Sequence, residues 1–181
     1  VSVFPLTLSG ITPTNGIWWN PAESGRGFIV ERQGTQLFLG AYLYEDSSGS
    51  STWYSSVLSQ QSNGSYTGAF TRFAGGQTLS GAYRAPTSNA EVAQVTLTFD
   101  SATTATLQVQ LSGSSARRAI ALELLRLGSD SASGASFQSG VWWNDAESGR
   151  GYVVEVQGTT AMLASFMFDS SGQPVWYLAT G

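Results

Sequence analysis

A twenty-residue segment that occurs twice in the chain constrains its fold more than any other feature. Residues 16–35 read GIWWNPAESGRGFIVERQGT, and residues 140–159 read GVWWNDAESGRGYVVEVQGT, with fifteen identical positions. The likeness continues more loosely, because the DSSG and WY of residues 46–54 return in residues 169–177. All six tryptophans lie inside these two copies. We therefore expect two structural units that begin in the same way.

The rest of the first unit has no counterpart in the second. Residues 59–127 carry alternating runs such as VAQVTLTF and ATLQVQL, whereas residues 128–139 read GSDSASGASFQS and have the composition of a linker. The sequence therefore divides into an N-terminal segment (1–15), a complete β unit (16–127), a linker (128–139) and a partial second copy (140–181).

Alternation of apolar and polar residues over short runs predicts strands, and short Gly- and Asn-rich connectors predict hairpins. Only 11% of the residues are charged, which suits strands and turns better than long surface helices. Residues 116–127 also fit a helical period, but we interpret them as a strand. The fold class expected is all-β, an antiparallel meander that closes into a barrel-like domain. The predicted strands are 16–20, 27–33, 36–45, 52–59, 65–73, 77–84, 92–100, 104–111, 116–126, 140–144, 151–157, 160–168 and 174–180.

The partial copy has two alternative arrangements. It completes the same barrel as the first unit, giving one pseudo-symmetric domain in which the two motifs are equivalent corners, or it forms an incomplete second domain whose open edge needs a partner chain. The N-terminal segment, with apolar Val1, Val3, Phe4 and Leu6, is a candidate for that missing edge. We favour the single domain, because an isolated four-stranded remnant buries too little surface.

Adjacent aromatic residues on one strand point to opposite faces. One tryptophan of each Trp-Trp pair is therefore expected in the core, and its neighbour faces outward unless another layer covers it. An outward aromatic ring is a platform for a sugar or another apolar ligand, whereas the simpler interpretation is that the rings pack both faces of a curved sheet. The four aromatic pairs are Trp18-Trp19, Trp53-Tyr54, Trp142-Trp143 and Trp176-Tyr177.

The stretch between the tryptophans and the next strand has the composition of a tight turn, since its glycines tolerate positive φ. Glu23 and Arg26 lie three residues apart in this turn and recur as Glu147 and Arg150. The simpler interpretation is an ion pair that holds the turn, with the arginine stacked on a tryptophan. The alternative is a pair that recognises a polar ligand beside a tryptophan.

Several classes of catalytic and metal site lack the residues they need. The chain has no His and no Cys, which removes Ser-His-Asp triads, Cys nucleophiles and His- or Cys-based metal centres. No cofactor and no metal is expected. The local carboxylate pairs are Glu23 with Glu31 and Glu147 with Glu155, and we expect Glu31 to face solvent. A glycoside-type hydrolase is therefore the least favoured function.

Charge and hydropathy limit the partners. The net charge of −4 gives no basic surface for nucleic acid, and no apolar run is long enough to span a membrane. A Lys-free chain rich in Ser, Thr and Gly favours export from the cell.

The repeated motif, its later Trp-Tyr hairpin and the pair VTLTFD and TATL of residues 95–107 resemble a family of uncharacterised bacterial exported β proteins. In that family a GxWWNPxESGxG opening precedes a DxxGxPxWY hairpin, in tandem units. The resemblance implies bacterial export, to the periplasm, the cell surface or the medium, and brings no activity with it. Separately, Gly16-x-Trp18 is similar to the opening of lipocalin- and avidin-type barrels, which implies a small closed barrel with a ligand mouth.

We expect a non-catalytic extracellular module that binds a glycan or another surface ligand. The alternative is a structural module that self-associates or pairs with other chains through open strand edges. The candidate ligand-binding residues are Trp18, Trp19, Glu23, Arg26, Trp53, Tyr54, Trp142, Trp143, Glu147, Arg150, Trp176 and Tyr177.

Overall fold

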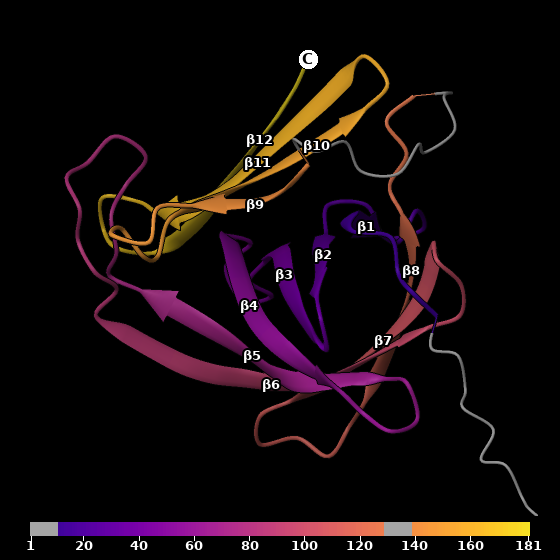
Figure 1. The fold of residues 1–181 in the computed structure, drawn as a ribbon. Helices are drawn as coiled ribbons and strands as arrows, with labels where there is room; N and C mark the ends of the chain where they lie inside the picture. Colours follow the sequence, from indigo (N-terminus) through magenta and orange to yellow (C-terminus); the bar gives the residue numbers. More distant parts are fainter. Residues whose placement is uncertain (1–10, 129–138) are drawn as a thin grey trace, which may run out of the picture.

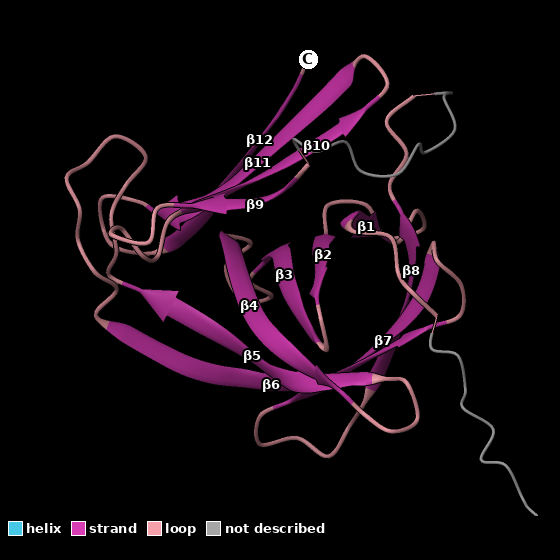
Figure 2. Ribbon diagram, viewed as in Figure 1, coloured by secondary structure: helices cyan, strands magenta, loops and turns pink. Residues whose placement is uncertain are grey.

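The structure is a computed structural model that describes residues 11–128 and 139–181. Every regular element in these ranges is a strand, as Figure 2 shows. The described part of the chain contains no helix long and apolar enough to cross a membrane. The apolar positions 1–6, considered above as a source of an edge strand, lie outside the described residues.

The first eight strands form a closed antiparallel barrel (Figure 1). Each strand pairs with the next, and β1 pairs with β8 to close the ring, with Trp18 opposite Leu124. This arrangement confirms the predicted all-β meander and its closure. The strands are β1 (Gly16–Trp19), β2 (Gly27–Gln33), β3 (Gln36–Tyr44), β4 (Ser51–Gln60), β5 (Tyr66–Ala74), β6 (Ser88–Phe99), β7 (Thr104–Leu111) and β8 (Arg118–Leu124).

Apolar side chains fill the barrel lumen. Trp18 is fully buried and meets Phe99 edge-on with the ring centroids 5.5 Å apart, and Tyr66 meets the same ring at 5.9 Å. An eight-stranded barrel is just wide enough to be filled by its own side chains. The inward positions of the strands therefore supply a packed core in place of the expected ligand mouth.

Residues 116–126 and 77–84 test the strand predictions most severely. The first segment forms the strand β8, in which buried and exposed positions alternate, so the predicted strand is confirmed and the helical alternative is not adopted. The prediction of a strand at 77–84 is wrong. That segment is a loop, because its polar groups bond to the second copy: the N–H of Phe168 donates to the carbonyl of Gln77 (3.1 Å), and Gln77 Nε2 donates to the carbonyl of Glu147 (3.2 Å).

The second copy forms a separate sheet that covers one side of the barrel. The expectation that it completes the same barrel is therefore wrong, because β1 pairs with β8 and closes the ring without it. Its strands are β9 (Gly140–Trp143), β10 (Gly151–Gln157), β11 (Thr160–Phe168) and β12 (Pro174–Thr180), in the order β12-β11-β10-β9. Figure 1 shows this sheet lying over the outer face of β1 to β4. Between the two layers lies a second apolar cluster, which includes Ile29 and Trp53 of the barrel and Val153 and Phe168 of the sheet.

The two copies face each other through reciprocal contacts. The indole Nε1 of Trp53 donates to the carbonyl of Met167 at 2.9 Å, and the indole of the equivalent Trp176 donates to the carbonyl of Leu43 at 3.0 Å. Leu43 and Met167 are themselves equivalent positions of the repeat. Such an exchange of the same contact in both directions is the signature of an isologous interface. The copies are therefore related by an approximate two-fold axis within one chain.

Candidate functional site

The repeated turn has the same local structure in both copies. In the first, Asn20 Oδ1 accepts the N–H of Ala22 at 3.0 Å, and in the second Asn144 Oδ1 accepts the N–H of Ala146 at 3.1 Å. The glycine before the arginine has a φ of 91° in one copy and 92° in the other, a conformation that side chains oppose. An asparagine that caps its own turn and a glycine with positive φ therefore define this loop from sequence alone.

The motif's glutamate and arginine pair within each turn. Arg26 binds Glu23, and Arg150 binds Glu147. The guanidinium of Arg26 lies 5.9 Å from the ring centre of Phe28, so it stacks on phenylalanine and not on the tryptophan that the sequence suggested. These contacts support the interpretation in which the pair holds the turn.

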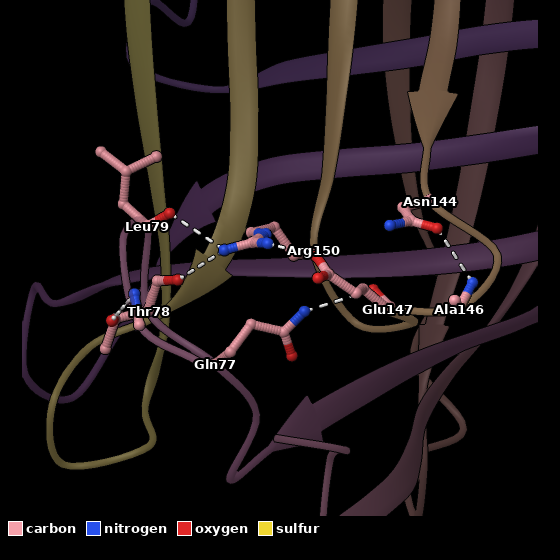
Figure 3. Close-up of polar contacts among 8 residues, drawn as sticks. Gln77, Thr78, Leu79, Asn144, Ala146, Glu147 and Arg150 are labelled. Carbon is pink, nitrogen blue, oxygen red and sulfur yellow. Dashed lines mark hydrogen bonds and ion pairs between the residues drawn. The ribbon is translucent and has the colours of Figure 1, made fainter. Parts of the chain in front are cut away.

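Arg150 has a further task that its counterpart lacks. Its Nη1 donates to the carbonyls of Thr78 (3.1 Å) and Leu79 (2.9 Å), as Figure 3 shows. The second turn is thus tied to the loop between β5 and β6, while Glu23 of the first turn is joined by Arg118 at 2.9 Å. Arg150 is therefore held by a carboxylate and two carbonyls, whereas Arg26 is held by Glu23 and the ring of Phe28, so Arg150 has less of its charge available to a ligand.

The first tryptophan of each pair has opposite environments in the two copies. Trp18 lies in the barrel lumen and is 0% exposed, whereas the equivalent Trp142 is 54% exposed on the face of the second sheet that points away from the barrel. The later aromatic pairs divide in the same way. Trp53 and Trp176 lie in the layer between the copies; Tyr54 packs against the barrel core, whereas its counterpart Tyr177 is 54% exposed.

The second tryptophan of each pair borders a groove between the two layers. Trp19, half-buried, lines a groove of about 170 Å³, which we call the Trp19 groove. Trp143, 62% exposed, lines one of about 350 Å³, the Trp143 groove. The approximate two-fold axis relates the two, since equivalent residues line both. These are Ile17 and Val141, Trp19 and Trp143, Gly25 and Gly149, Arg26 and Arg150, Tyr42 and Phe166, and Met162 and Phe38.

The grooves differ in polarity and in reach. Exposed Gln33 and Gln36 line the Trp143 groove, whereas the Trp19 groove is almost wholly apolar. A hollow of about 520 Å³ shares Ser148, Gly149 and Phe166 with the Trp143 groove. That hollow is lined by further uncharged residues, including Ser55, Pro86, Thr87 and Asn89. The Trp143 side is therefore the larger and more polar of the two candidate sites.

Glu31 and Glu155 lie between the layers, so the expectation that Glu31 faces solvent is wrong. Glu31 Oε2 accepts the N–H of Val141 at 2.6 Å. Glu155 lies at the equivalent place opposite Ile17 and is only 3% exposed. Burial raises the pKa of the Glu155 carboxyl, and the side chain of Gln157 and the backbone of Ile17 offset part of this rise.

The positions of the carboxylates give little support to a hydrolase or to a metal site. Glu23 and Glu147 are ion-paired, and their possible partner carboxylates belong to the interface between the copies. In residues 11–128 and 139–181, no group of three or more His, Cys, Asp or Glu could hold a metal ion. At the second hairpin tip, hydrogen bonds from Ser171 and Gln173 lower the pKa of Asp169, so that carboxylate organises its own turn.

Sequence reasoning found the tryptophans of the grooves but missed several groove residues. Phe38 and Phe166 line the Trp143 groove although they come from different copies. The sequence predicts Glu31 to be a solvent-facing residue or a catalytic partner, yet its identity with Glu155 in the repeat is a signal of a shared structural role. Comparison with known proteins finds no matching family model, and no curated protein or solved structure matches the chain.

Proposed function

We propose that this protein is a non-catalytic binding module whose principal ligand site is the Trp143 groove together with the adjoining hollow. The observation that carries the proposal is Trp143 itself, a 62% exposed ring beside a groove of about 350 Å³. An exposed apolar patch that is rimmed by polar residues commonly marks a ligand-binding groove. The ring offers an apolar face, and Gln33 and Gln36 offer hydrogen-bonding groups on the same groove.

The chemistry of the groove favours a glycan. Sugar rings have an apolar face that stacks on tryptophan and hydroxyls that bond to uncharged polar groups. The arginine of the site is held by Glu147 and by two backbone carbonyls, so it is poorly placed to bind a free anion. The extension past Ser148 into the larger hollow gives room for more than one ring.

The Trp19 groove is proposed as a smaller second site, formed by the equivalent residues of the repeat. It is about 170 Å³ in volume, and its tryptophan is half-buried, so less apolar surface is available to a ligand. With the expected export from a bacterial cell, the ligand would be met at the cell surface or outside it.

The test compares Trp143→Ala with Trp142→Ala. The two residues are neighbours and similarly exposed, but only Trp143 lines the groove. The protein is screened on a glycan array, and any hit is measured by isothermal titration. Trp143→Ala is expected to weaken binding by about 1–3 kcal/mol, in line with the loss of one stacked aromatic ring at a binding hot spot.

Trp142→Ala is the matched control and is expected to bind as the wild type does. A glycan that binds both variants equally would contradict the groove assignment. An array without hits would leave the grooves without a glycan ligand and would turn attention to the second candidate function.

The second candidate is assembly with further strands. It is favoured by a specific observation: the sheet β9 to β12 has an outer face on which Leu163 and Tyr177 are 43% and 54% exposed. Exposed apolar side chains on a sheet face that no described strand covers mark a surface for a protein partner.

A further inference from the structure

The outer face of the second sheet consists of the residues that fill half of the barrel in the first copy. Leu163 is equivalent to Leu39, which is 0% exposed in the lumen. Tyr152 is equivalent to Phe28, which is 2% exposed. In the second copy Leu163 is 43% exposed and Tyr152 is half-buried, so these positions are core in the first copy and partly exposed in the second. The first copy therefore shows which strands can cover the outer face of the second sheet.

In the barrel, that cover is the meander β5 to β8. The meander joins β4 at one end, where Ser59 pairs with Thr67, and β1 at the other, where Trp19 pairs with Glu123. In the second sheet the strands equivalent to β4 and β1 are β12 and β9, and these are its two edges. Both ladders that hold the cover in the first copy are therefore open to new partners within the described part of the second.

We propose that the outer face of β9 to β12 is a docking surface for a four-stranded antiparallel meander of the β5 to β8 type, which turns the second copy into a second eight-stranded barrel. The occupant is polypeptide with the pattern of residues 66–124. It pairs along the edges of β12 and β9, so the new contacts continue the interface already present between the two halves of the first barrel.

The chemistry of the face restricts its occupant. Tyr152, Val154, Leu163, Val175 and Tyr177 carry no charge, so a charged partner would lose hydration without a counter-ion. The inward residues of the template are apolar in the same way. They include Phe70, Val95, Leu107 and Ile120.

This inference deepens the assembly role and does not depend on ligand binding. Trp143 and its groove lie on the side of the sheet that faces the barrel, whereas Leu163 lies on the other side. A failure of one proposal therefore leaves the other standing.

The experiment appends a second copy of the residues that form β5 to β8 to the second sheet. Residues 178–181 are replaced by a second copy of residues 55–127, because Tyr177 is equivalent to Tyr54. The chain has no cysteine, so a single introduced thiol reports on its own surroundings. Leu163→Cys is the probe, Leu39→Cys is the buried reference, and Leu111→Cys, at a position 60% exposed, is the exposed reference.

In the wild-type length, the Leu163→Cys thiol is expected to react as fast as that of Leu111→Cys. In the extended chain its labelling should slow by about tenfold or more, toward the rate of Leu39→Cys, because a buried thiol reacts only on local opening. The extended chain should be a monomer by light scattering and should contain more strand by infrared spectroscopy.

Three results would overturn the inference. The Leu163→Cys thiol could remain as reactive in the extended chain, or the appended residues could add no strand. Protection that appears in the wild-type length only at high protein concentration would assign the face to a second copy of the chain.

Discussion

Residues at the same position of the repeat have different physical surroundings in the two copies. Glu31 is half-buried and bonded to the N–H of Val141, while Glu155 is 3% exposed, and its Oε2 has no hydrogen-bond partner among the described residues. A buried carboxyl with an unsatisfied oxygen is costly when it is ionised. Glu155 is therefore a residue at which stability depends on pH.

Glu155→Gln is expected to raise stability at neutral pH relative to the wild type. Burial raises the pKa of Glu155 in the folded state, so the folded protein binds this proton more tightly than the unfolded chain does. The wild type therefore loses stability from this group as the pH rises from 4.5 through the raised pKa, and the glutamine does not. Urea unfolding of the wild type and the variants, at about one measurement per pH unit from roughly pH 2 to pH 8, measures the difference in the free energy of unfolding.

Asp169→Asn is the control of opposite sign. Hydrogen bonds lower the pKa of Asp169 in the folded state, so its stabilising contribution is present above the ordinary value of 3.8 and is lost as the pH falls from 3.8 through the lowered pKa. A Glu155→Gln difference that stays constant with pH would contradict a buried, ionising carboxyl at this position.

At the level of the elements, local interactions determine the structure of the repeated turn, whereas contacts with the second copy determine that of the loop between β5 and β6. The turn is built by its own asparagine and glycine, so it is the same in both copies. The loop, residues 75–87, has alternating residues that predict a strand. Its polar groups bond to the second copy instead, with the N–H of Gly75 on the carbonyl of Gly172 at 2.8 Å.

Arg150→Ala is expected to destabilise the protein by about 1–3 kcal/mol, because it removes charge-assisted hydrogen bonds to Glu147, Thr78 and Leu79. Hydrogen exchange should become faster in residues 75–87. Urea unfolding and exchange mass spectrometry measure the two effects. Arg118→Ala, at a side chain 65% exposed, should cost less than about 0.5 kcal/mol, and equal losses would argue against a structural role specific to Arg150.

For the whole molecule, the layer between the copies is a second core. Trp53 is 3% exposed there and contacts Phe73, Phe166 and Phe168, with ring centroids 5.2 to 5.7 Å apart. Aromatic rings bury large areas and add about 0.5–1.5 kcal/mol per well-arranged pair. The barrel and the second sheet should therefore unfold together.

Trp53→Phe is expected to destabilise the whole protein by about 1–3 kcal/mol, since it removes apolar contact and leaves the carbonyl of Met167 without its indole donor. Trp143→Phe, at an exposed ring, is the control and should change stability by less than about 0.5 kcal/mol. Far-UV circular dichroism during urea unfolding should show a single transition in all three proteins. Two separate transitions in the wild type would contradict a shared second core.

The sequence was sufficient to predict whatever depends on local physics. Alternation predicted most strands, and the asparagine, glycines and Glu–Arg pair predicted the repeated turn, because these interactions are made within a few residues. Opposite directions for the two tryptophans of a pair followed from the strand period, as Trp18 inside and Trp19 outside show. Closure of the meander followed from the cost of open strand edges.

Only the tertiary structure decided which of two identical residues is buried. Trp18 and Trp142 occupy the same position of the repeat, yet their exposures are 0% and 54%, because β5 to β8 cover the first and not the second. Each groove is likewise lined by residues from both copies. Glu155 lies in the second sheet and is buried because the barrel packs against that sheet. The burial of a residue depends on what packs against it. The repeat therefore determines which side chains share one face of the sheet, and the strands that pack on that face determine whether those side chains are buried.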